Sequence, residues 1–343
     1  MNALLLTKYK HLELTDLPVP PFRPGEVLVR IRAAGICGSD VHGYDGGSGR
    51  RIPPLVMGHE AAGIVEEIGA DVKRFQPGDR VTFDSTVYCG QCFFCHSGDT
   101  NLCDNRQVLG VSTDTYRRNG AFAEFVAVPE RIVHQIPDSL TFERAALIEP
   151  TTVAVHAVNL TPVTLGDTAV VVGVGMIGLL AVQALRLAGC ARVIAVDVDE
   201  AKLHAARGLG ATAQINSKTS NAPAQILEMT DGRGADIVLE AVGAAASIRT
   251  AIESVRKGGT VTLIGNLAPA VEFALQSVVT RQIRLQGSCA SAGEYPACID
   301  LLNRGAILVD SLISAVAPLS EGPEWFERLY QREPNLTKVV LQP

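Results

Sequence analysis

The pattern of apolar and polar positions changes between residues 150 and 165. Up to about residue 150, short apolar runs are punctuated by Gly and Pro, as in GEVLVRIRAAGI, AAGIVEEIG, GDRVTF and AFAEFVAVPE. Such runs are typical of strands joined by turns, so we expect an irregular β-rich barrel. From about residue 165, apolar β-branched runs alternate with Ala- and Leu-rich helical segments. Repeated βα units predict a parallel, doubly wound sheet.

The second part of the chain contains five predicted strands and three predicted helices. The strands are TAVVVG, ARVIAVD, ADIVLEAVG, GTVTLIGN and RQIRLQGS, and the helices are LLAVQALRLAG, EAKLHAARGLG and a segment near 248–256. The stretch from about residue 290 is mixed in pattern, and we expect it to return to the first part. The predicted organisation is α/β, with one domain over 1–150 and 290–343 and a doubly wound domain over 151–289.

Composition and charge narrow the class of protein. Hydrophobic residues make up 47% of the chain and charged residues 19%, which is typical of an ordinary globular protein. The net charge of −6 disfavours a nucleic-acid platform. The most apolar stretch, 169–182, is shorter than the roughly 20 residues that span a bilayer. The N-terminus has no cleavable signal pattern, so we expect a soluble, cytoplasmic protein.

A glycine-rich turn lies between a predicted buried strand and a helix. In VVVGVGMIG the glycines have GxGxxG spacing, and Met176 and Ile177 lie within the same turn. Gly173 permits a tight turn, Gly175 lets backbone approach a pyrophosphate, and Gly178 allows close packing of helix on strand. The order of strand, turn and helix therefore predicts a dinucleotide site at these five residues, whereas the same turn in isolation would indicate only a turn.

An acidic residue ends the next predicted strand. Asp197 lies nineteen residues beyond Gly178, at the end of ARVIAVD. A carboxylate there can accept hydrogen bonds from ribose hydroxyls and repel a 2′-phosphate, which favours NAD over NADP. Lys202 is a further candidate to approach the ribose. The alternative for Asp197 is a plain helix cap.

Four of the eight cysteines form the pattern CxxCxxCx7C: Cys89, Cys92, Cys95 and Cys103. Their spacing is too short for independent disulfides, and four thiolates can close a tetrahedron around zinc without leaving an open position. We therefore expect a structural zinc site. An iron–sulfur cluster is the alternative, because such clusters also use four cysteines. His96 lies within this loop and is expected to be solvated.

A second set of possible metal ligands is dispersed along the chain. Cys37 lies in GICGSDVH, His59 and Glu60 lie in GHE, and Glu149 lies in IEP. Spacing alone does not join them, and each can equally be an ordinary buried thiol, imidazole or polar contact. A set of Cys, His and carboxylate leaves one zinc position open for water or substrate, as a catalytic zinc requires.

With GICGSDVH, GHEAAG, the four-cysteine loop and VVGVGMIG in this order, the whole chain resembles the zinc-dependent medium-chain alcohol dehydrogenases. The segment ALIEPTTVAVHAV resembles the sorbitol and other polyol dehydrogenases most. The resemblance implies a GroES-like catalytic domain, a Rossmann domain for NAD and a cleft between them. It also implies one catalytic and one structural zinc per chain, and a homo-oligomer, either a dimer or a tetramer.

The resemblance further implies roles for individual residues. Cys37 and His59 match the catalytic zinc ligands, and either Glu60 or Glu149 completes the shell, directly or through water. Asp40 matches an acid that orients the ligand histidine and fixes its tautomer.

Ser39 and His42 match the proton relay of this family. The chemistry needs a relay, because the proton of the zinc-activated hydroxyl must leave a closed site. The alternatives are that Ser39 caps a helix and that His42 lies at the surface.

The function expected from the resemblance is oxidation of a secondary hydroxyl of a polyol or sugar derivative to a ketone, with NAD as acceptor. Alternative substrates are another secondary alcohol, such as L-threonine, or a sugar acid, and a non-catalytic NAD-binding protein is a further alternative. A zinc-free quinone or enoyl reductase is disfavoured by the metal-ligand candidates and Asp197. The expected pocket-lining stretches, 44–51 and 111–118, carry no substrate signature. Arg117 and Arg118 suit an acidic or phosphorylated substrate, although surface charge is the commoner explanation.

Overall fold

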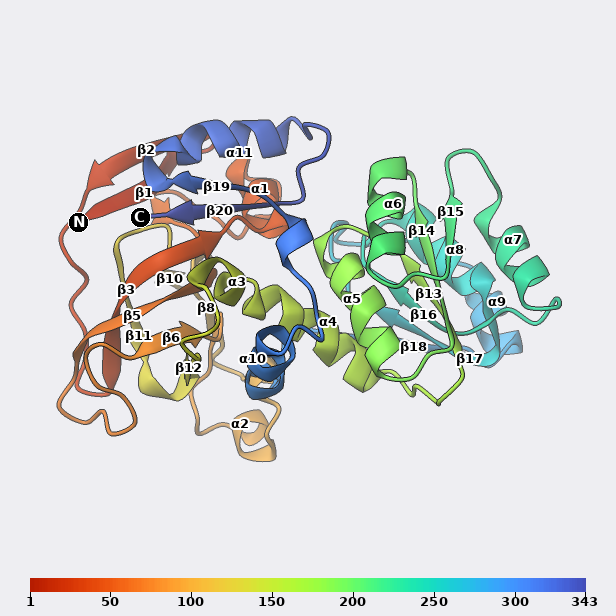
Figure 1. The fold of residues 1–343 in the computed structure, drawn as a ribbon, viewed down its shortest axis with the longest axis horizontal. Helices are drawn as coiled ribbons and strands as arrows, with labels where there is room; N and C mark the ends of the chain where they lie inside the picture. Colours follow the sequence, from red (N-terminus) through yellow and green to blue (C-terminus); the bar gives the residue numbers. More distant parts are fainter. The chain divides into compact units, whose positions relative to one another are not determined.

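The computed structural model describes residues 1–343 and divides into two compact units. The first unit comprises Met1–Glu149 and Ala292–Pro343, and the second comprises Pro150–Ser291. The model confirms the expected α/β class, with a β-rich unit and a unit built on a parallel sheet (Figure 1). None of the helices is both long enough and apolar enough to cross a bilayer.

The first unit is built mainly from strands. They are β1 (Asn2–Lys8), β2 (His11–Asp16), β3 (Glu26–Gly35), β4 (Leu55–Val56), β5 (Glu60–Ile68), β6 (Arg80–Phe83), β7 (Thr86–Val87), β8 (Gln107–Val108), β9 (Val111–Ser112), β10 (Arg117–Arg118), β11 (Phe125–Pro129), β12 (Val133–Gln135), β19 (Ile313–Pro318) and β20 (Lys338–Gln342). Seven of them form one sheet in the order β12-β6-β5-β3-β20-β19, with β11 also paired to β3. This sheet is an open, mixed sheet, so the expected barrel is not a closed ring of hydrogen-bonded strands.

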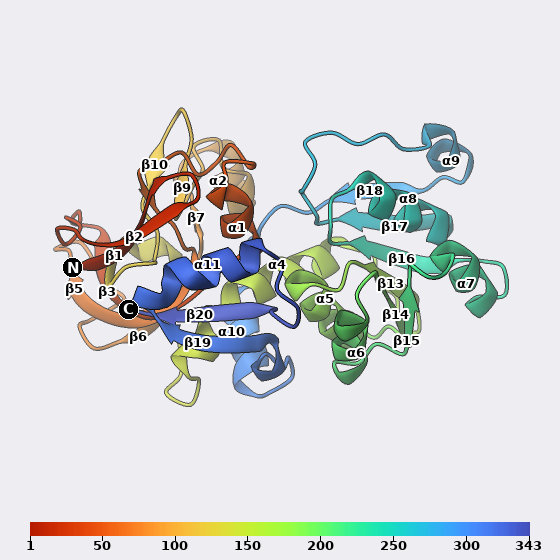
Figure 2. The same ribbon diagram turned by 90° about the horizontal axis from the view of Figure 1, so that it is seen from above.

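The helices of the first unit are short and lie around this sheet (Figure 2). They are α1 (Gly38–Tyr44), α2 (Phe93–Ser97), α3 (Phe142–Ala146), α10 (Tyr295–Asn303) and α11 (Gly322–Tyr330), with 3₁₀ turns at Thr100–Leu102, Glu130–Ile132, Asp310–Leu312 and Leu319–Glu321. The helix α4 (Ile148–Leu160) begins at the end of the first unit's N-terminal segment.

The C-terminal segment completes the core of the first unit. Val340 of β20 pairs with Gly35 of β3, so the last strand of the chain lies beside β3 in the sheet. From α11, Phe326 is fully buried and meets Phe122 edge-on, with ring centroids 5.7 Å apart. Burial of such aromatic side chains contributes about 1.5–3 kcal/mol each, which favours the return of this segment. The stretch expected to return from about residue 290 thus packs on the first part.

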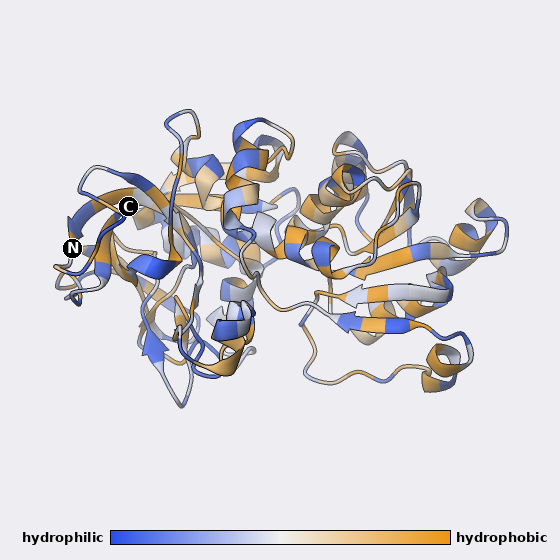
Figure 3. Cartoon of the chain, turned by 90° about the horizontal axis from the view of Figure 1, so that it is seen from below, coloured by the Kyte–Doolittle hydropathy of each residue, from blue (hydrophilic) through white to orange (hydrophobic).

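The second unit is a six-stranded parallel sheet. Its strands are β13 (Thr168–Val172), β14 (Arg192–Asp197), β15 (Ala213–Asn216), β16 (Ala235–Glu240), β17 (Val255–Leu263) and β18 (Arg284–Gly287), in the order β15-β14-β13-β16-β17-β18. In chain order this is 3-2-1-4-5-6, the order of the Rossmann fold. All five residues of β13 are buried, as expected for a central strand covered on both faces. In Figure 3 the strands of this sheet are mostly orange or white.

The helices of the second unit are α5 (Met176–Leu187), α6 (Glu200–Gly208), α7 (Ala222–Met229), α8 (Ala245–Ser254) and α9 (Leu275–Thr280). Figure 2 shows α5 and α6 toward one face of the sheet and α7 and α8 toward the other, as in a doubly wound fold.

Two details of the second unit differ from the sequence-based expectation. The helix expected near 248–256 is α8 and ends at Ser254, because Val255 is already in β17 and pairs with Ala235 of β16. The short elements β15, α7 and α9 were not predicted. In β15 only Ile215 is buried, so this edge strand lacks the long apolar run that marks the central strands.

Candidate active site

The dispersed candidates Cys37, His59 and Glu60 come together in the first unit. Their possible ligand atoms all lie within 4.8 Å of one another. The register of β3 and β5 explains this meeting, because Gly35 pairs with Glu60 across the antiparallel ladder. Cys37 follows Gly35 by two residues, and His59 precedes Glu60 by one. Strand pairing therefore joins residues that sequence spacing alone does not.

The turn after β3 fixes the position of the Cys37 thiol. Cys37 is the N-cap of α1, and its Sγ accepts a hydrogen bond from the backbone N–H of Ser39 at 3.5 Å. In return, Asp40 accepts a hydrogen bond from the backbone N–H of Cys37 at 3.3 Å. This reciprocal capping arrangement satisfies free N–H groups of the helix terminus and orients the thiol. The residue that caps α1 is thus Cys37, and not Ser39.

A buried acid lies behind His59. Asp40 is fully buried, and its Oδ1 lies 3.4 Å from His59 Nδ1 and 3.0 Å from Arg51 Nη2. Burial raises the pKa of Asp40, but the positive charges of His59 and Arg51 lower it by more, so this pKa lies well below its usual value. Burial lowers the pKa of His59, but the interactions with Asp40 and Cys37 raise it by more, so this pKa lies well above its usual value. Asp40 therefore stays ionised and holds the imidazole in one orientation.

The carboxylate of Glu60 has a buried cationic partner that the sequence analysis did not identify. Lys338 opens β20, is 2% exposed, and donates from Nζ to Glu60 Oε2 at 2.5 Å and to the Ile36 carbonyl at 3.0 Å. Burial lowers the pKa of Lys338, but attraction to Glu60 and Cys37 gives a net increase. A lysine at the start of the apolar run KVVL is the only local signal that could have indicated this residue.

Glu149 lies near this cluster, but it does not belong to the set of residues whose ligand atoms lie within 4.8 Å of one another. Its Oε1 accepts a hydrogen bond from Ser85 Oγ at 2.8 Å. Burial raises the pKa of Glu149, and the charge of His59 acts in the opposite direction. The structure thus distinguishes the two carboxylates that the sequence left equivalent, since Glu60 faces the thiol and imidazole directly.

Ser39 and His42 lie three residues apart on α1, which places them on the same side of the helix. Ser39 Oγ accepts a hydrogen bond from Arg51 Nη2 at 3.3 Å, so the hydroxyl is connected to the Asp40 network. His42 lies in the last turn and is partly exposed.

The donor set fits a zinc ion with an open coordination position. One thiol, one imidazole and one carboxylate are the ligand types that zinc takes, and a catalytic zinc keeps three protein ligands. His59 Nδ1 is buried and makes no hydrogen bond of good geometry, although it faces Asp40. The usual arrangement at a metal-bound histidine pairs one ring nitrogen with a carboxylate and leaves the other for the metal.

The four cysteines of the CxxCxxCx7C loop form a second cluster. Their sulfur atoms lie within 4.8 Å of one another, with Cys92 Sγ 3.5 Å and Cys89 Sγ 3.9 Å from Cys95 Sγ. A tetrahedron with metal–sulfur bonds of about 2.3 Å has edges of about 3.8 Å, which these distances match. None of the eight cysteines forms a disulfide. The backbone N–H of Gln91 helps lower the pKa of the Cys89 thiol to about 6, which favours a thiolate ligand.

The glycine-rich turn of the second unit has the geometry of a dinucleotide loop. Gly173 follows β13 with φ +87°, a backbone conformation that favours glycine, and Gly175 is the N-cap of α5. A Cβ on Gly178 would lie 2.0 Å from the Gly173 carbonyl oxygen, so only glycine permits this approach of helix to turn. Met176 and Ile177 form the first turn of α5, whose N-terminus provides free N–H groups for a phosphate.

Asp197 ends β14 beside this turn. Its Oδ2 accepts a hydrogen bond from the Val174 N–H at 2.8 Å, and its Oδ1 accepts from Val198 at 2.7 Å. The helix cap that was the alternative role of Asp197 falls instead to Asp199, whose side chain accepts from the Ala201 N–H at the start of α6. Lys202 lies in the first turn of α6 and makes no ion pair.

Two family models match the chain, an alcohol dehydrogenase GroES-like domain over residues 23–138 and a zinc-binding dehydrogenase domain over 176–304. Together they cover more than half of the chain and include both metal-ligand clusters, and the second begins at Met176, directly after Gly175 of the dinucleotide turn. The chain belongs to the zinc-dependent medium-chain alcohol dehydrogenases. This membership confirms the family resemblance and the GroES-like and Rossmann architecture expected from the sequence.

Similar proteins include enzymes named for polyols. The chain is 34% identical to a sorbitol dehydrogenase of Bacillus subtilis, over 100% of this chain and 97% of that one. It is 34% identical to a D-arabitol-phosphate dehydrogenase of Enterococcus avium, over 97% and 94%. A solved zinc-binding dehydrogenase of Sinorhizobium meliloti bound to NADP has a TM-score of 0.90 and 31% identity, covering 100% of this chain and 99% of that one. Within this family, the chain is of the zinc-containing alcohol and polyol dehydrogenase type.

Within the stretches expected to line the substrate pocket, Tyr44 and Arg118 are placed differently, whereas Arg51 contacts Asp40 beside the cluster. Tyr44 is buried in the core, where its ring meets Phe326 and Tyr330 and its hydroxyl donates to the Lys10 carbonyl. Arg118 pairs with Glu26 at the far end of β3 from Gly35. Neither residue is therefore available for substrate at the Cys37–His59–Glu60 cluster.

Proposed function

We propose that this protein oxidises a secondary hydroxyl of a polyol or sugar derivative to the ketone, with NAD as the hydride acceptor. The balanced reaction converts the alcohol and NAD⁺ to the ketone, NADH and one proton. The observation that supports it most directly is the cluster of Cys37, His59 and Glu60, whose ligand atoms lie within 4.8 Å of one another. Three such ligands leave room for a substrate oxygen at a zinc ion.

The residues present would hold two zinc ions in different roles. Cys37, His59 and Glu60 would hold the catalytic ion, Glu149 would contribute through water, and the four cysteines would hold a structural ion. When bound at the first site, zinc supplies Lewis acidity that lowers the pKa of a bound hydroxyl. Asp40, fixed by Arg51, keeps the His59 ring oriented toward the metal.

The proton released from the hydroxyl needs a path to water, and α1 offers one. Ser39 Oγ accepts from Arg51 Nη2 at 3.3 Å, which leaves its own hydroxyl proton free to be donated. His42, one helical turn further along and partly exposed, is suited to pass the proton to solvent.

Two features of the second unit support NAD as the cofactor. The turn at Gly173, Gly175 and Gly178, with Met176 and Ile177, offers backbone N–H groups to the pyrophosphate. Asp197 provides a carboxylate, held by the Val174 N–H, that would accept from ribose hydroxyls and repel a 2′-phosphate. Lys202 would approach the same ribose. Because one similar structure holds NADP, both cofactors belong in the test.

The test is the rate of NADH or NADPH formation by the zinc-loaded protein with polyols, polyol phosphates, sugar acids, simple secondary alcohols and L-threonine. We expect turnover with NAD and a group of related polyols, and loss of turnover after chelation. Turnover confined to L-threonine or sugar acids would replace the substrate assignment but keep the reaction class. No turnover of any substrate by protein that retains zinc and binds NADH would refute the enzyme assignment in favour of a non-catalytic NAD-binding protein.

We also propose a cytoplasmic homo-oligomer. The strand β18 ends the parallel sheet, and its edge is open to pairing. On α9, Leu275 and Val279 are 64% and 68% exposed, which is unusual for large apolar side chains. Light scattering on the purified protein distinguishes a dimer from a tetramer, and a monomer at micromolar concentration would contradict this proposal.

A further inference from the structure

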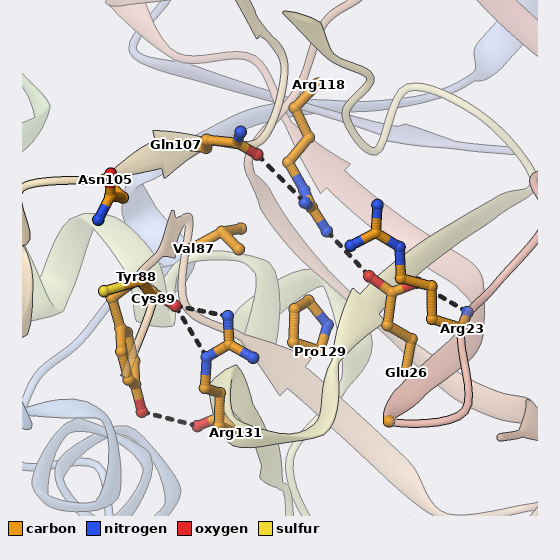
Figure 4. Close-up of a pocket in the computed structure, with 11 residues that line it drawn as sticks. Arg23, Glu26, Val87, Tyr88, Cys89, Asn105, Gln107, Arg118, Pro129 and Arg131 are labelled. Carbon is orange, nitrogen blue, oxygen red and sulfur yellow. Dashed lines mark hydrogen bonds and ion pairs between the residues drawn. The ribbon is translucent and has the colours of Figure 1, made fainter. Parts of the chain in front are cut away.

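A pocket of about 320 Å³ in the first unit is lined by three arginines and a single carboxylate (Figure 4). The lining residues come from the turn before β3, the end of β7, the segment before and at β8, β10, the end of β11 and the 3₁₀ turn that follows it. They are Arg23, Gly25, Glu26, Val87, Tyr88, Cys89, Asn105, Gln107, Arg118, Pro129 and Arg131. None of the metal-ligand candidates Cys37, His59, Glu60 or Glu149 is among them.

The pocket lies at the opposite end of β3 from the proposed catalytic cluster. Glu26 is the first residue of β3, and Gly35, which pairs with Glu60, is its last. A strand advances about 3.3 Å per residue, so roughly 30 Å of strand separates these two residues. The arginines of this pocket are therefore not a substrate subsite of the Cys37–His59–Glu60 cluster.

The charges of the lining residues do not balance. Arginine keeps its positive charge at all accessible pH values, so three guanidinium groups face one carboxylate and one thiolate, that of Cys89, in a chain whose net charge is −6. The Glu26 carboxylate lies 3.5 Å from Arg118 Nη2, and it also accepts a hydrogen bond from the Arg23 backbone N–H at 2.9 Å. The Arg23 side chain is exposed and makes no ion pair.

Arg118 is the most buried of the three and is poorly satisfied. Its side chain is 21% exposed, its Nε is buried without a hydrogen-bond partner, and its Nη1 lies 3.4 Å from Gln107 Oε1. Burial lowers the pKa of Arg118, attraction to Glu26 raises it, and repulsion from Arg131 and Arg23 lowers it again, for a net decrease. A buried guanidinium with two long contacts gains more from a further anion than a well-paired one would.

Arg131 is held in place with part of its guanidinium unused. Its Nε and Nη2 both donate to the Tyr88 carbonyl, at 2.8 and 2.5 Å, and the Tyr88 hydroxyl donates to the Arg131 carbonyl at 3.3 Å. The third nitrogen, Nη1, has no partner. Figure 4 shows the Arg131 and Arg118 side chains reaching into the pocket from different sides, with Pro129 and Val87 between their chains. A guanidinium fixed in advance loses little conformational entropy when it binds a ligand.

We propose that this pocket binds the phosphate group of a small molecule, between Arg118 and Arg131 with Arg23 at the rim. Guanidinium groups match the oxygen geometry of phosphate, and a doubly charged oxyanion offsets the excess of positive charge. The volume exceeds that of inorganic phosphate alone, so the pocket also accommodates the organic part of a small phosphate monoester. Because Cys89 lines the same pocket, a phosphate bound there would lie beside the four-cysteine cluster.

The test is calorimetric titration of the full zinc-loaded chain with inorganic phosphate and, separately, with glycerol 1-phosphate, at low ionic strength. Arg118→Gln is expected to weaken binding by about tenfold or more, because it removes a charge-assisted hydrogen bond. Glu26→Gln is expected to tighten binding by several-fold, because it removes the competing carboxylate and keeps an acceptor for the Arg23 N–H. Arg32→Gln, on the exposed side of β3, makes the same change in charge outside the pocket and is expected to leave the affinity within about twofold.

Arg118→Gln and Glu26→Gln are expected to change the phosphate affinity in opposite directions, so Glu26→Gln still tests the proposal if Arg118→Gln folds poorly. Tighter monoester than phosphate binding, with the same dependence on both variants, would identify an organic phosphate as the ligand, and equal binding would identify inorganic phosphate. The proposal is overturned if neither ligand binds, which would mean that the arginines only offset the zinc thiolates. It is also overturned if the variants bind as Arg32→Gln does, which would place the phosphate elsewhere, for example at the glycine-rich turn.

Discussion

The role of Gly175 can be separated from the role of a neighbouring glycine in the same turn. A Cβ built on Gly175 meets nothing within 4 Å, and its backbone, with φ −70° and ψ −163°, is accessible to alanine. Gly175→Ala is therefore expected to lower the free energy of unfolding by about 1 kcal/mol or less, the difference between Gly and Ala at an N-cap. The new methyl group would instead occupy the space through which a pyrophosphate approaches the backbone.

Gly178→Ala makes the same chemical change three residues away with the opposite expectation. Its Cβ would lie 2.0 Å from the Gly173 carbonyl oxygen and 2.9 Å from the Gly173 carbonyl carbon, both backbone atoms that cannot rotate away. The helix must shift from the turn, and forced overpacking of this kind costs about 1–3 kcal/mol. Gly178→Ala should therefore lower stability as well as NAD affinity.

The assay measures NADH affinity by fluorescence titration and stability by urea unfolding for both variants and the wild type. We expect Gly175→Ala to lose at least about tenfold in affinity, equivalent to about 1.4 kcal/mol, with a smaller decrease in the unfolding midpoint than Gly178→Ala. Normal NADH affinity in Gly175→Ala would show that the cofactor does not approach this turn. A stability loss in Gly175→Ala as large as that of Gly178→Ala would show that the space beside Gly175 is not open.

Three further predictions concern cofactor choice, the cysteine loop and a buried acid. Asp197→Ala should raise the use of NADP relative to NAD, measured as the ratio of the kcat/KM values for the two cofactors. It should also loosen the glycine-rich turn, because the Asp197 carboxylate holds this turn through the Val174 N–H. An unchanged ratio would mean that the carboxylate does not face the ribose. Cys95→Ala should release zinc and lower the melting temperature, and selective loss of activity at full stability would contradict the structural role. Burial, with the charge of Glu149, raises the pKa of Asp84 to about 7. The protonated acid therefore contributes stability that is fully present at a pH below its usual pKa of 3.8 and is lost as the pH rises through 7. Asp84→Asn should therefore be more stable than the wild type at pH 8, by about 2–4 kcal/mol, with the difference vanishing near pH 4; parallel pH profiles would refute it.

The dinucleotide turn could be predicted from the sequence because all of its determinants are local. The three glycines, the buried strand before them and the helix after them all lie within residues 168–187, and Asp197 ends the adjacent strand. The metal cluster could not be predicted in this way. Cys37 and Glu60 meet because Gly35 and Glu60 are paired, and this register is not visible in the spacing of the chemical groups themselves.

Arg51 and Lys338 were missed for a related reason. Each is a buried cation whose partner lies on another element, Asp40 on α1 for Arg51 and Glu60 on β5 for Lys338. A charged residue of this kind appears in a sequence as an ordinary surface residue, because its burial depends on the tertiary structure. The same holds for Arg118. The sequence suggested that it would bind a phosphorylated substrate, whereas its side chain lies in the pocket at the start of β3.

The central claim is that Cys37 belongs to a metal site at which a hydroxyl is oxidised. Zinc content and the rate of NADH formation, measured together on Cys37→Ala with Cys190→Ala as a control, test it most directly. Cys190 is a buried cysteine of the second unit with no place in either cluster. The account predicts that Cys37→Ala folds, binds NADH, loses one zinc per chain and has no turnover, while Cys190→Ala resembles the wild type. Wild-type turnover by Cys37→Ala, or full zinc content in that variant, would contradict the account.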